Sequence, residues 1–200
     1  MTQWQRIDLR DGGLHHAPQW LARDPADALF AALHDAIAWE CHRIVLFGRE
    51  VESPRLSCWI GDPDASYTYS RTRFSPRPWP EALRSIRARL RDELGVDCNG
   101  VLANLYRDGR DGMGWHADDE PQIDASAPIA SLSLGAARRF VLRRRDDHAQ
   151  RQAIELGHGS LLVMAAGMQQ HWQHALPKTA RAIGPRINLT FRRIVPAGDD

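Results

Sequence analysis

Apolar residues recur three and four positions apart in two stretches of the first hundred residues, and this spacing predicts two amphipathic helices. The first covers 24–39, where Asp24 can cap the N-terminus and Pro25 suits the first turn. The second covers 80–95, where Gly95 can end the helix. The apolar positions that share a face are Leu29, Leu33 and Ile37 in the first helix and Leu83, Ile86, Leu90 and Leu94 in the second.

Short runs rich in β-forming residues replace the helical spacing after Gly95, and turns rich in Gly, Asp and Pro separate them. Further pieces of this kind lie between the two helices. In chain order the runs are 43–47, 55–60, 66–70, 100–106, 128–134, 138–144, 152–157, 160–165 and 186–194. So many strands at close spacing indicate a sandwich or a barrel. With two helices outside the β-rich part, we expect a single α+β, mainly β domain.

The composition is that of a globular chain, with 200 residues of which 43% are hydrophobic and 26% charged. No apolar run is long enough to cross a bilayer, and the N-terminal segment lacks the apolar core of a signal peptide. We therefore expect a cytoplasmic protein with no membrane partner. Cys41, Cys58 and Cys98 are scattered and form no CxxC pair, which favours reduced thiols over disulfides or a zinc knuckle.

Arginine carries almost all of the positive charge, because Lys178 is the only lysine, and the formal net charge is only +1. Arginine forms bidentate contacts with phosphates and carboxylates. Two clusters stand out: the stretch "RSIRARLRD", which contains Arg91, and the Arg138–Arg145 run. Both could contact a nucleic-acid backbone, or both could lie on solvated faces.

The string "GWHADDE" at 114–120 places His116 beside a cluster of acids. His116 and Asp118 are two residues apart, so on a strand or at its end their side chains point the same way. Iron and zinc both accept imidazole nitrogen and carboxylate oxygen. Taken alone, the pair is a weak signal and is more typical of a solvated acidic loop. A metal site would need a further ligand, for which His171 or His174 on a downstream turn are candidates.

The last predicted strand carries its polar side chains on one face. Arg186, Asn188, Thr190 and Arg192 alternate with apolar residues. In a barrel this polar face could line the lumen, where a buried arginine needs an anionic partner. A small dicarboxylate beside a metal would serve, whereas a zinc site would give these arginines no role.

Taken together, the motifs resemble those of the AlkB family of Fe(II)/2-oxoglutarate-dependent dioxygenases, and most of all the branch that repairs alkylated DNA. The motifs are "NLYRDGRDGMGWHADDE", "PIASLSLGAARRFVLRRR", "HGSLLVMAAGMQQHWQHALP" and "PRINLTFRRI". The resemblance is dense over 104–194 and looser over 46–70. It implies a double-stranded β-helix (jelly-roll) core over 99–195. The preceding part, 1–98, would carry an N-terminal extension, the two flanking helices and a substrate-recognition lid.

The resemblance also implies a role for individual positions in the core. The iron ligands would be His116, Asp118 and His174, with His174 preferred to His171 because it directly precedes "ALP". Arg186 would grip the distal carboxylate of 2-oxoglutarate, and Arg192 would belong to the catalytic residues as well. The residues around the co-substrate would be Asn104, Tyr106, Arg186, Asn188, Thr190 and Arg192.

Substrate contacts are implied mainly by the N-terminal part of the chain. Phe47 with Gly48 matches an apolar finger of duplex-acting relatives, and Tyr67 and Tyr69 match a base-contacting segment, although ordinary core aromatics remain the alternative. The complete set of expected substrate contacts is Phe47, Gly48, Arg55, Tyr67, Tyr69 and Asp119. Glu120, the last acid of "GWHADDE", has no role in this interpretation.

The implied activity is oxidative demethylation of N-alkylated DNA bases of the 1-methyladenine and 3-methylcytosine type. It would require Fe(II), O2 and 2-oxoglutarate, which is decarboxylated to succinate while formaldehyde is released. The base must be flipped or presented on a single strand. We expect a monomer acting on alkylated DNA, with RNA as a further possible partner. The alternatives are an oxygenase of RNA, protein or a small molecule, and a metal-free β-barrel that only binds.

Overall fold

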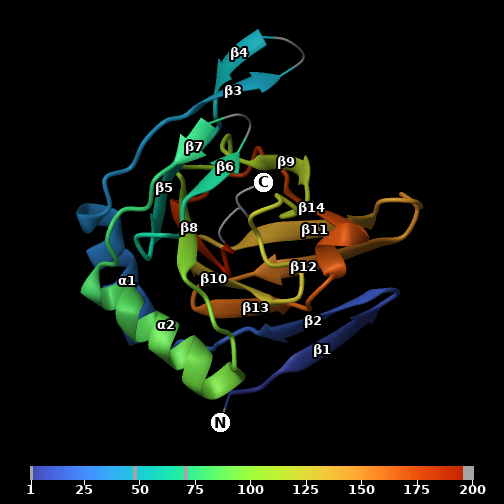
Figure 1. Cartoon of the computed structure of the whole chain (residues 1–200), viewed down its shortest axis with the longest axis horizontal. Coiled ribbons are helices and arrows are strands. Elements are labelled where there is room, and N and C mark those ends of the chain that lie inside the picture. The colour runs from blue at the N-terminus through green and yellow to red at the C-terminus, as the bar shows by residue number, and fades with distance from the viewer. Residues whose placement is uncertain (1, 47–48, 70–71, 196–200) are drawn as a thin grey trace.

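Two antiparallel sheets form the centre of the computed structural model, which describes residues 2–46, 49–69 and 72–195 (Figure 1). The larger sheet has the strand order β1-β2-β13-β10-β15-β8-β5, and the smaller has the order β12-β11-β14-β9. The strands of the larger sheet are β1 (Gln5–Leu9), β2 (Gly12–Ala17), β5 (Leu56–Gly61), β8 (Gly100–Tyr106), β10 (Ile129–Gly135), β13 (Ser160–Met164) and β15 (Arg186–Arg192). Those of the smaller sheet are β9 (Met113–His116), β11 (Arg138–Arg144), β12 (Arg151–Leu156) and β14 (Trp172–Leu176).

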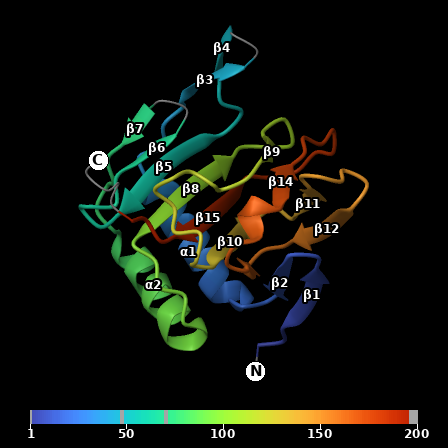
Figure 2. The same cartoon turned by 45° about the vertical axis from the view of Figure 1, so that its right-hand side comes forward.

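Two helices cover the outer face of the larger sheet (Figures 1 and 2). They are α1 (Arg23–Ala36) and α2 (Glu81–Leu94), and a short 3-10 turn, η1 (Met168–Gln170), precedes β14. Apolar residues of both helices share one buried cluster with every second residue of β8, β10 and β15. A second apolar cluster, which includes Phe140 and Leu142 of β11 and Leu162 of β13, fills part of the space between the sheets.

The face of the larger sheet that turns away from the helices is polar in its central strands. Because side chains alternate along a strand, burying Ile187, Leu189 and Phe191 under the helices turns Arg186 and Asn188 toward the smaller sheet. The polar residues therefore point into the space between the two sheets. This arrangement agrees with the expected jelly-roll core and with the expected polar lumen.

Two small hairpins complete the described fold. They pair β3 (Arg43–Leu46) with β4 (Arg49–Glu52) and β6 (Tyr67–Tyr69) with β7 (Thr72–Phe74). The β3–β4 hairpin projects from the body of the molecule at the top of Figures 1 and 2. Within the residues that the structure describes, no helix combines the length and apolar character that crossing a bilayer requires.

The two helices and the strand runs lie close to where the sequence predicts them, but the predicted end of the first helix at 39 and one predicted cap are wrong, because α1 ends at Ala36. The residue that caps α1 is Ala22, which makes no side-chain cap hydrogen bond, and Asp24 lies in the first turn. An acidic side chain there still stabilises the helix through the helix dipole. Gly95 ends α2 as predicted, with a φ of 65°. Ile37 follows the last helical residue of α1 and is buried.

The N-terminal part of the chain contributes strands to the main sheet. β1 and β2 extend one edge of the larger sheet through β13, and β5 forms the other edge beside β8. Neither β1 nor β2 was predicted, because "QRIDL" and "GLHHA" show little apolar alternation. A boundary between an N-terminal part and a catalytic core at 98/99 stays a prediction.

Candidate active site

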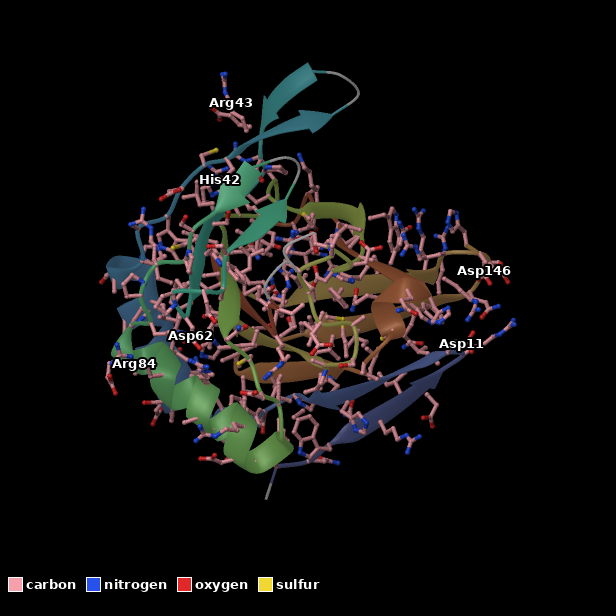
Figure 3. All side chains as sticks on the ribbon, viewed as in Figure 1. Asp11, His42, Arg43, Asp62, Arg84 and Asp146 are labelled. Carbon is pink, nitrogen blue, oxygen red and sulfur yellow. The ribbon has the colours of Figure 1, made fainter. Side chains whose placement is uncertain are left out.

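A cavity of about 300 Å³ opens between the two sheets, a volume suited to a small-molecule ligand. Its walls come mainly from the polar face of the larger sheet and from β9 and β14 of the smaller sheet. His42 and Arg43, which Figure 3 labels at the base of the β3–β4 hairpin, also line it. The expected site residues among its walls are Arg55, Asn104, Tyr106, His116, Asp118, His174, Arg186, Asn188, Thr190 and Arg192.

Three potential metal ligands meet on one side of this cavity. One ligand atom from each of His116, Asp118 and His174 lies within 4.8 Å of the other two. His116 ends β9 and stands opposite His174 on β14, and their ring centroids are 4.2 Å apart. His174 therefore lies inside a strand, and the turn predicted for it is wrong. The preference for His174 over His171 agrees with this geometry, because His171 lies outside both the cluster and the cavity lining.

The histidines are prepared to bind a metal as neutral imidazoles. His116 Nδ1 lies 2.9 Å from the carbonyl oxygen of Gly114 and donates to it in the neutral ring, so that Nε2 is left bare toward the cluster. Burial lowers the pKa of His116. Burial also lowers the pKa of His174 to about 3, and the repulsion that the two rings would feel if both were protonated adds to this. Both rings can therefore offer a lone pair without first losing a proton.

Asp118 is a buried carboxylate whose charge is held by an arginine. Arg192 Nη2 donates to Asp118 Oδ1 at 2.6 Å, and Arg192 Nε donates to Oδ2 at 3.2 Å. Burial alone would raise the pKa of Asp118, but Arg192 and the two histidines lower it to about 2. The backbone N–H of Asp118 donates to Gln169 Oε1 at 3.0 Å, which fixes the loop after β9. Two histidines and one carboxylate on one side of an open cavity match the donor set of non-haem Fe(II) sites.

Arg186 is the second buried arginine of β15, and it has no carboxylate partner among the described residues. Its side chain is 2% exposed, Nη2 donates to Ser133 Oγ at 2.9 Å, and Nε has no hydrogen-bond partner among those residues. The guanidinium lies 5.3 Å from the ring centroid of Tyr106, its cross-strand neighbour. Burial lowers the pKa of Arg186 to about 10, so it remains charged near neutral pH. A buried, uncompensated cation that lines the same cavity as the three potential metal ligands fits the free carboxylate of a dicarboxylic acid.

The other expected co-substrate residues form two small groups in the same wall. Asn188 stands opposite Asn104 across the β15–β8 pair. Asn188 Nδ2 donates to Ser131 Oγ and to the carbonyl oxygen of Leu132, and Thr190 Oγ1 donates to Asn188 Oδ1. Asn188 and Thr190 are therefore already hydrogen-bonded within their own sheet. Asn104 differs from Asn188, because it is bonded to Arg55.

The expected substrate contacts are described only in part. Phe47 and Gly48 lie outside the described residues, as do the side chains of Tyr67 and Tyr69, whose backbone forms β6. Asp119 is absent from the cavity lining and borders a neighbouring cavity of about 220 Å³. Its carboxylate pairs with Arg145 at 2.7 Å.

Glu120 is the cavity residue that the sequence left without a role. It lines the same cavity as the three potential metal ligands, and its Oε2 is buried with no hydrogen-bond partner among the described residues. Burial raises the pKa of its carboxyl group. Ser131, which also lines the cavity, was missed too, although the alternation in "SLSL" offered a signal because it turns both serines of that string to one face.

The Arg138–Arg145 run is only partly available to a nucleic acid. Arg138 is buried and donates to the carbonyl oxygens of Asp111 and Pro177, and Arg144 is buried between Asp11 and Asp146, which lie together in Figure 3. For these two arginines neither alternative, phosphate contact or a solvated face, is correct, because both are buried and their guanidinium groups hold parts of the fold together. Others of the run reach the surface: Arg139 and Arg145 are exposed, and the half-buried Arg143 lies over the ring of Trp115.

The chain matches proteins of one oxygenase superfamily. A family profile described as "2OG-Fe(II) oxygenase superfamily" matches residues 13–192. DNA oxidative demethylase ALKBH2 of Mus musculus is 37% identical over 181 residues, which cover 86% of this chain and 76% of that protein. Alpha-ketoglutarate-dependent dioxygenase alkB homolog 3 of Homo sapiens is 37% identical over 180 residues, covering 86% of this chain and 62% of that protein.

A solved structure agrees with the fold. The structure of OsALKBH1 covers 94% of this chain and 100% of that chain, with a TM-score of 0.63 at 18% sequence identity. The chain therefore belongs to the 2OG-Fe(II) oxygenase superfamily and, within it, to the AlkB family. It is an Fe(II)/2-oxoglutarate-dependent dioxygenase, a class that uses Fe(II), 2-oxoglutarate and O2.

Proposed function

We propose that this dioxygenase removes methyl groups from N-alkylated DNA bases, such as 1-methyladenine and 3-methylcytosine, with decarboxylation of 2-oxoglutarate to succinate and release of formaldehyde. The observation that carries the proposal is the similarity to ALKBH2 of Mus musculus, named a DNA oxidative demethylase, over 86% of this chain. The chemistry of the cavity also supports the proposal, because potential metal ligands and an arginine without a carboxylate partner among the described residues both line it.

His116, Asp118 and His174 would hold the iron. Three ligands on one side leave positions open for the co-substrate and for O2. When bound, Fe(II) supplies the activation of O2 that allows oxidation of an N-alkyl carbon. Arg192 keeps the carboxylate of Asp118 charged and oriented, and Gly114 fixes the tautomer of His116. These contacts orient two of the three ligands, His116 and Asp118, before the metal binds.

Arg186 would bind the distal carboxylate of 2-oxoglutarate. Its unpartnered Nε and the planar guanidinium offer the forked donor arrangement that a carboxylate accepts. Tyr106 lies against the same guanidinium, and Asn104 lines the next position of the wall. Because Thr190 donates a hydrogen bond to Asn188, and Asn188 donates one to Ser131, these two residues would shape this wall and contribute less direct binding.

The damaged base would enter the same cavity after it leaves the stack or from a single strand. Phe47, Gly48, Tyr67 and Tyr69 stay expected contacts, and Asp119 would have to leave Arg145 to reach the base. The exposed Arg139 and Arg145, and the half-buried Arg143 over the ring of Trp115, are candidates for phosphate contact. Action on RNA, a monomeric state and a cytoplasmic location are part of the proposal too.

The test is a demethylation assay. Purified protein, Fe(II), ascorbate and 2-oxoglutarate are mixed with single- and double-stranded DNA, and with RNA, each carrying one 1-methyladenine or 3-methylcytosine. We expect the loss of one methyl group by mass spectrometry and one formaldehyde for each succinate formed. The absence of turnover on every methylated strand, while the protein still binds iron and 2-oxoglutarate, would contradict the substrate class and leave the oxygenase class intact.

A further inference from the structure

Arg55 contacts a neighbouring side chain of the cavity wall. It directly precedes β5, is 8% exposed and lines the cavity. Arg55 Nε donates to Asn104 Oδ1 at 2.8 Å, and Nη1 donates to Ser53 Oγ at 3.1 Å. The β5–β8 pairing, in which Ser57 faces Asn104, brings the arginine to this position. Arg55 is therefore held in place by two side-chain contacts.

An asparagine amide has a carbonyl oxygen at one end and an NH2 group at the other, and the two ends have nearly the same shape. A guanidinium group only donates hydrogen bonds, so it can bond to the amide oxygen of Asn104 and not to its NH2 group. The contact therefore fixes which way the amide is turned. With Oδ1 held by Arg55, the NH2 group of Asn104 is the end that remains. No described residue hydrogen-bonds to Asn104 Nδ2, and Asn104 lines the cavity.

Asn188, directly across the sheet, provides the contrast. Both ends of its amide are occupied by Ser131, Leu132 and Thr190. Of the two facing amides in this wall, Asn104 is thus the one with donors to offer. A carboxylate needs donors, and an amide oxygen turned toward it would repel it.

We propose that Arg55 is a positioning residue, which holds the Asn104 amide with its NH2 group toward the cavity and so makes this wall a donor surface for the carboxylate of 2-oxoglutarate. The inference rests on the proposed co-substrate site. It differs from the expectation that Arg55 contacts the nucleic acid. Under the new assignment, Arg55 acts on the affinity for 2-oxoglutarate through Asn104 and has no part in DNA affinity.

Two substitutions separate the donor of Arg55 from its charge. In Arg55→Gln, Nε2 stands at the same place along the side chain as arginine Nε, so it can donate the same bond to Asn104 while the charge is gone. In Arg55→Met, the methyl group takes that place, and neither donor nor charge remains. Ser53→Ala is a milder third variant that releases Nη1 and leaves the bond to Asn104.

The measurement is the Kd of 2-oxoglutarate for the Mn(II)-loaded protein under anaerobic conditions, beside the Kd for a 3-methylcytosine oligonucleotide. We expect Arg55→Met to raise the Kd for 2-oxoglutarate roughly tenfold. Without Arg55 the Asn104 amide is no longer oriented, so the hydrogen bond from its NH2 group to the carboxylate of 2-oxoglutarate is lost. Arg55→Gln should stay within about threefold of the wild type, and Ser53→Ala should show a small rise. The oligonucleotide Kd should be unchanged in all three, and thermal unfolding identifies any variant that fails to fold.

Two outcomes would overturn the assignment. If Gln and Met raise the Kd for 2-oxoglutarate equally, Arg55 acts through its charge and does not orient Asn104. If both weaken oligonucleotide binding and leave the Kd for 2-oxoglutarate unchanged, Arg55 is a substrate contact. A wild-type protein that binds no 2-oxoglutarate would instead contradict the proposed co-substrate site itself, so the two failures are distinguishable.

Discussion

Arg186 and Arg192 stand on the same face of β15, and both are almost completely buried, but their surroundings differ. Arg192 is paired through two hydrogen bonds with Asp118, whereas Arg186 has no carboxylate partner among the described residues. A buried cation without an anion is costly to the fold. The difference indicates that Arg192 neutralises the charge of a metal ligand of the protein itself, Asp118. Arg186, in contrast, is available to bind an anion that comes from outside the chain.

Removing Asp118 should have the largest effect on this comparison. Asp118→Ala deletes a metal ligand and removes the carboxylate that pairs with Arg192, so we expect formaldehyde release to fall to background and Mn(II) binding to be lost. His171→Ala is the matched control, because His171 does not belong to the group of potential metal ligands. Metal affinity equal to the wild type in Asp118→Ala, or lost metal in His171→Ala, would mean that the ligands are assigned wrongly.

Removing each arginine in turn should give opposite effects on stability. In the protein without metal and co-substrate, Arg192→Met leaves Asp118 buried and unpaired and should lower the free energy of unfolding by about 3–5 kcal/mol. Arg186→Met removes an uncompensated charge and should leave that free energy unchanged or raise it. Urea denaturation of both variants beside the wild type measures the difference. Equal destabilisation by the two substitutions would remove the distinction between the arginines.

The pH dependence of stability should test the protonation states of His174 and Asp118, the metal ligands on the Arg192 side of the cavity. The folded-state pKa of His174 lies at about 3, below its ordinary value of 6.5, so the unfolded chain takes up this proton first as the pH falls. The free energy of unfolding of the metal-free protein should therefore decrease from pH 6.5 to 3, by up to about 1.4 kcal/mol per pH unit from this group. Asp118 acts at lower pH, since its pKa falls from 3.8 to about 2.

The contribution of His174 is isolated by His174→Leu. The variant should lose stability less steeply than the wild type between pH 6.5 and 3 in urea denaturation. Parallel curves for the two proteins over this range would show that His174 is not held neutral in the fold.

The smallest effect on stability is expected at an exposed ion pair formed by the loop after β9. Arg145 and Asp119 are ion-paired with side chains that are 41% and 43% exposed. Arg145→Gln should change the free energy of unfolding by no more than about 1 kcal/mol, because solvent screens such a pair. Its comparison with Arg192→Met by thermal unfolding separates a buried from an exposed arginine–aspartate pair, and a loss as large as that of Arg192→Met would contradict this account.

The parts of the fold that could be predicted are those whose residues show a local period. The spacing of Leu83, Ile86 and Leu90 indicates a helix, and the alternation over Arg186–Arg192 indicates a strand with one polar face, as observed. β14 escaped prediction because "WQHAL" has no such alternation, and β9 is only four residues long. These two strands hold the histidine ligands, so a turn was wrongly predicted for His174.

The parts of the site that could not be predicted depend on contacts between distant positions. The sequence suggests that arginines of "ARRFVLRRR" are exposed, but Arg144 reaches Asp11, 133 positions away. Gln169 supports Asp118 over a separation of 51 positions. No local pattern distinguishes Arg144 from the exposed arginines of the same run. Nor does a local pattern reveal that Glu120 lines the cavity while Asp119 pairs with Arg145. The metal ligands were identified because a resemblance joined motifs that lie far apart in the chain.

The most direct test of the account is the binding of 2-oxoglutarate by Arg186→Met. Calorimetric titration of the Mn(II)-loaded protein under anaerobic conditions should show one site per chain in the wild type. The Kd should rise roughly 100-fold in Arg186→Met, since charge-assisted hydrogen bonds contribute about 1.5–3 kcal/mol each. Arg181→Met, which alters an exposed arginine, should bind like the wild type. Binding by Arg186→Met as tight as that of the wild type would contradict the claim that this buried arginine waits for the co-substrate.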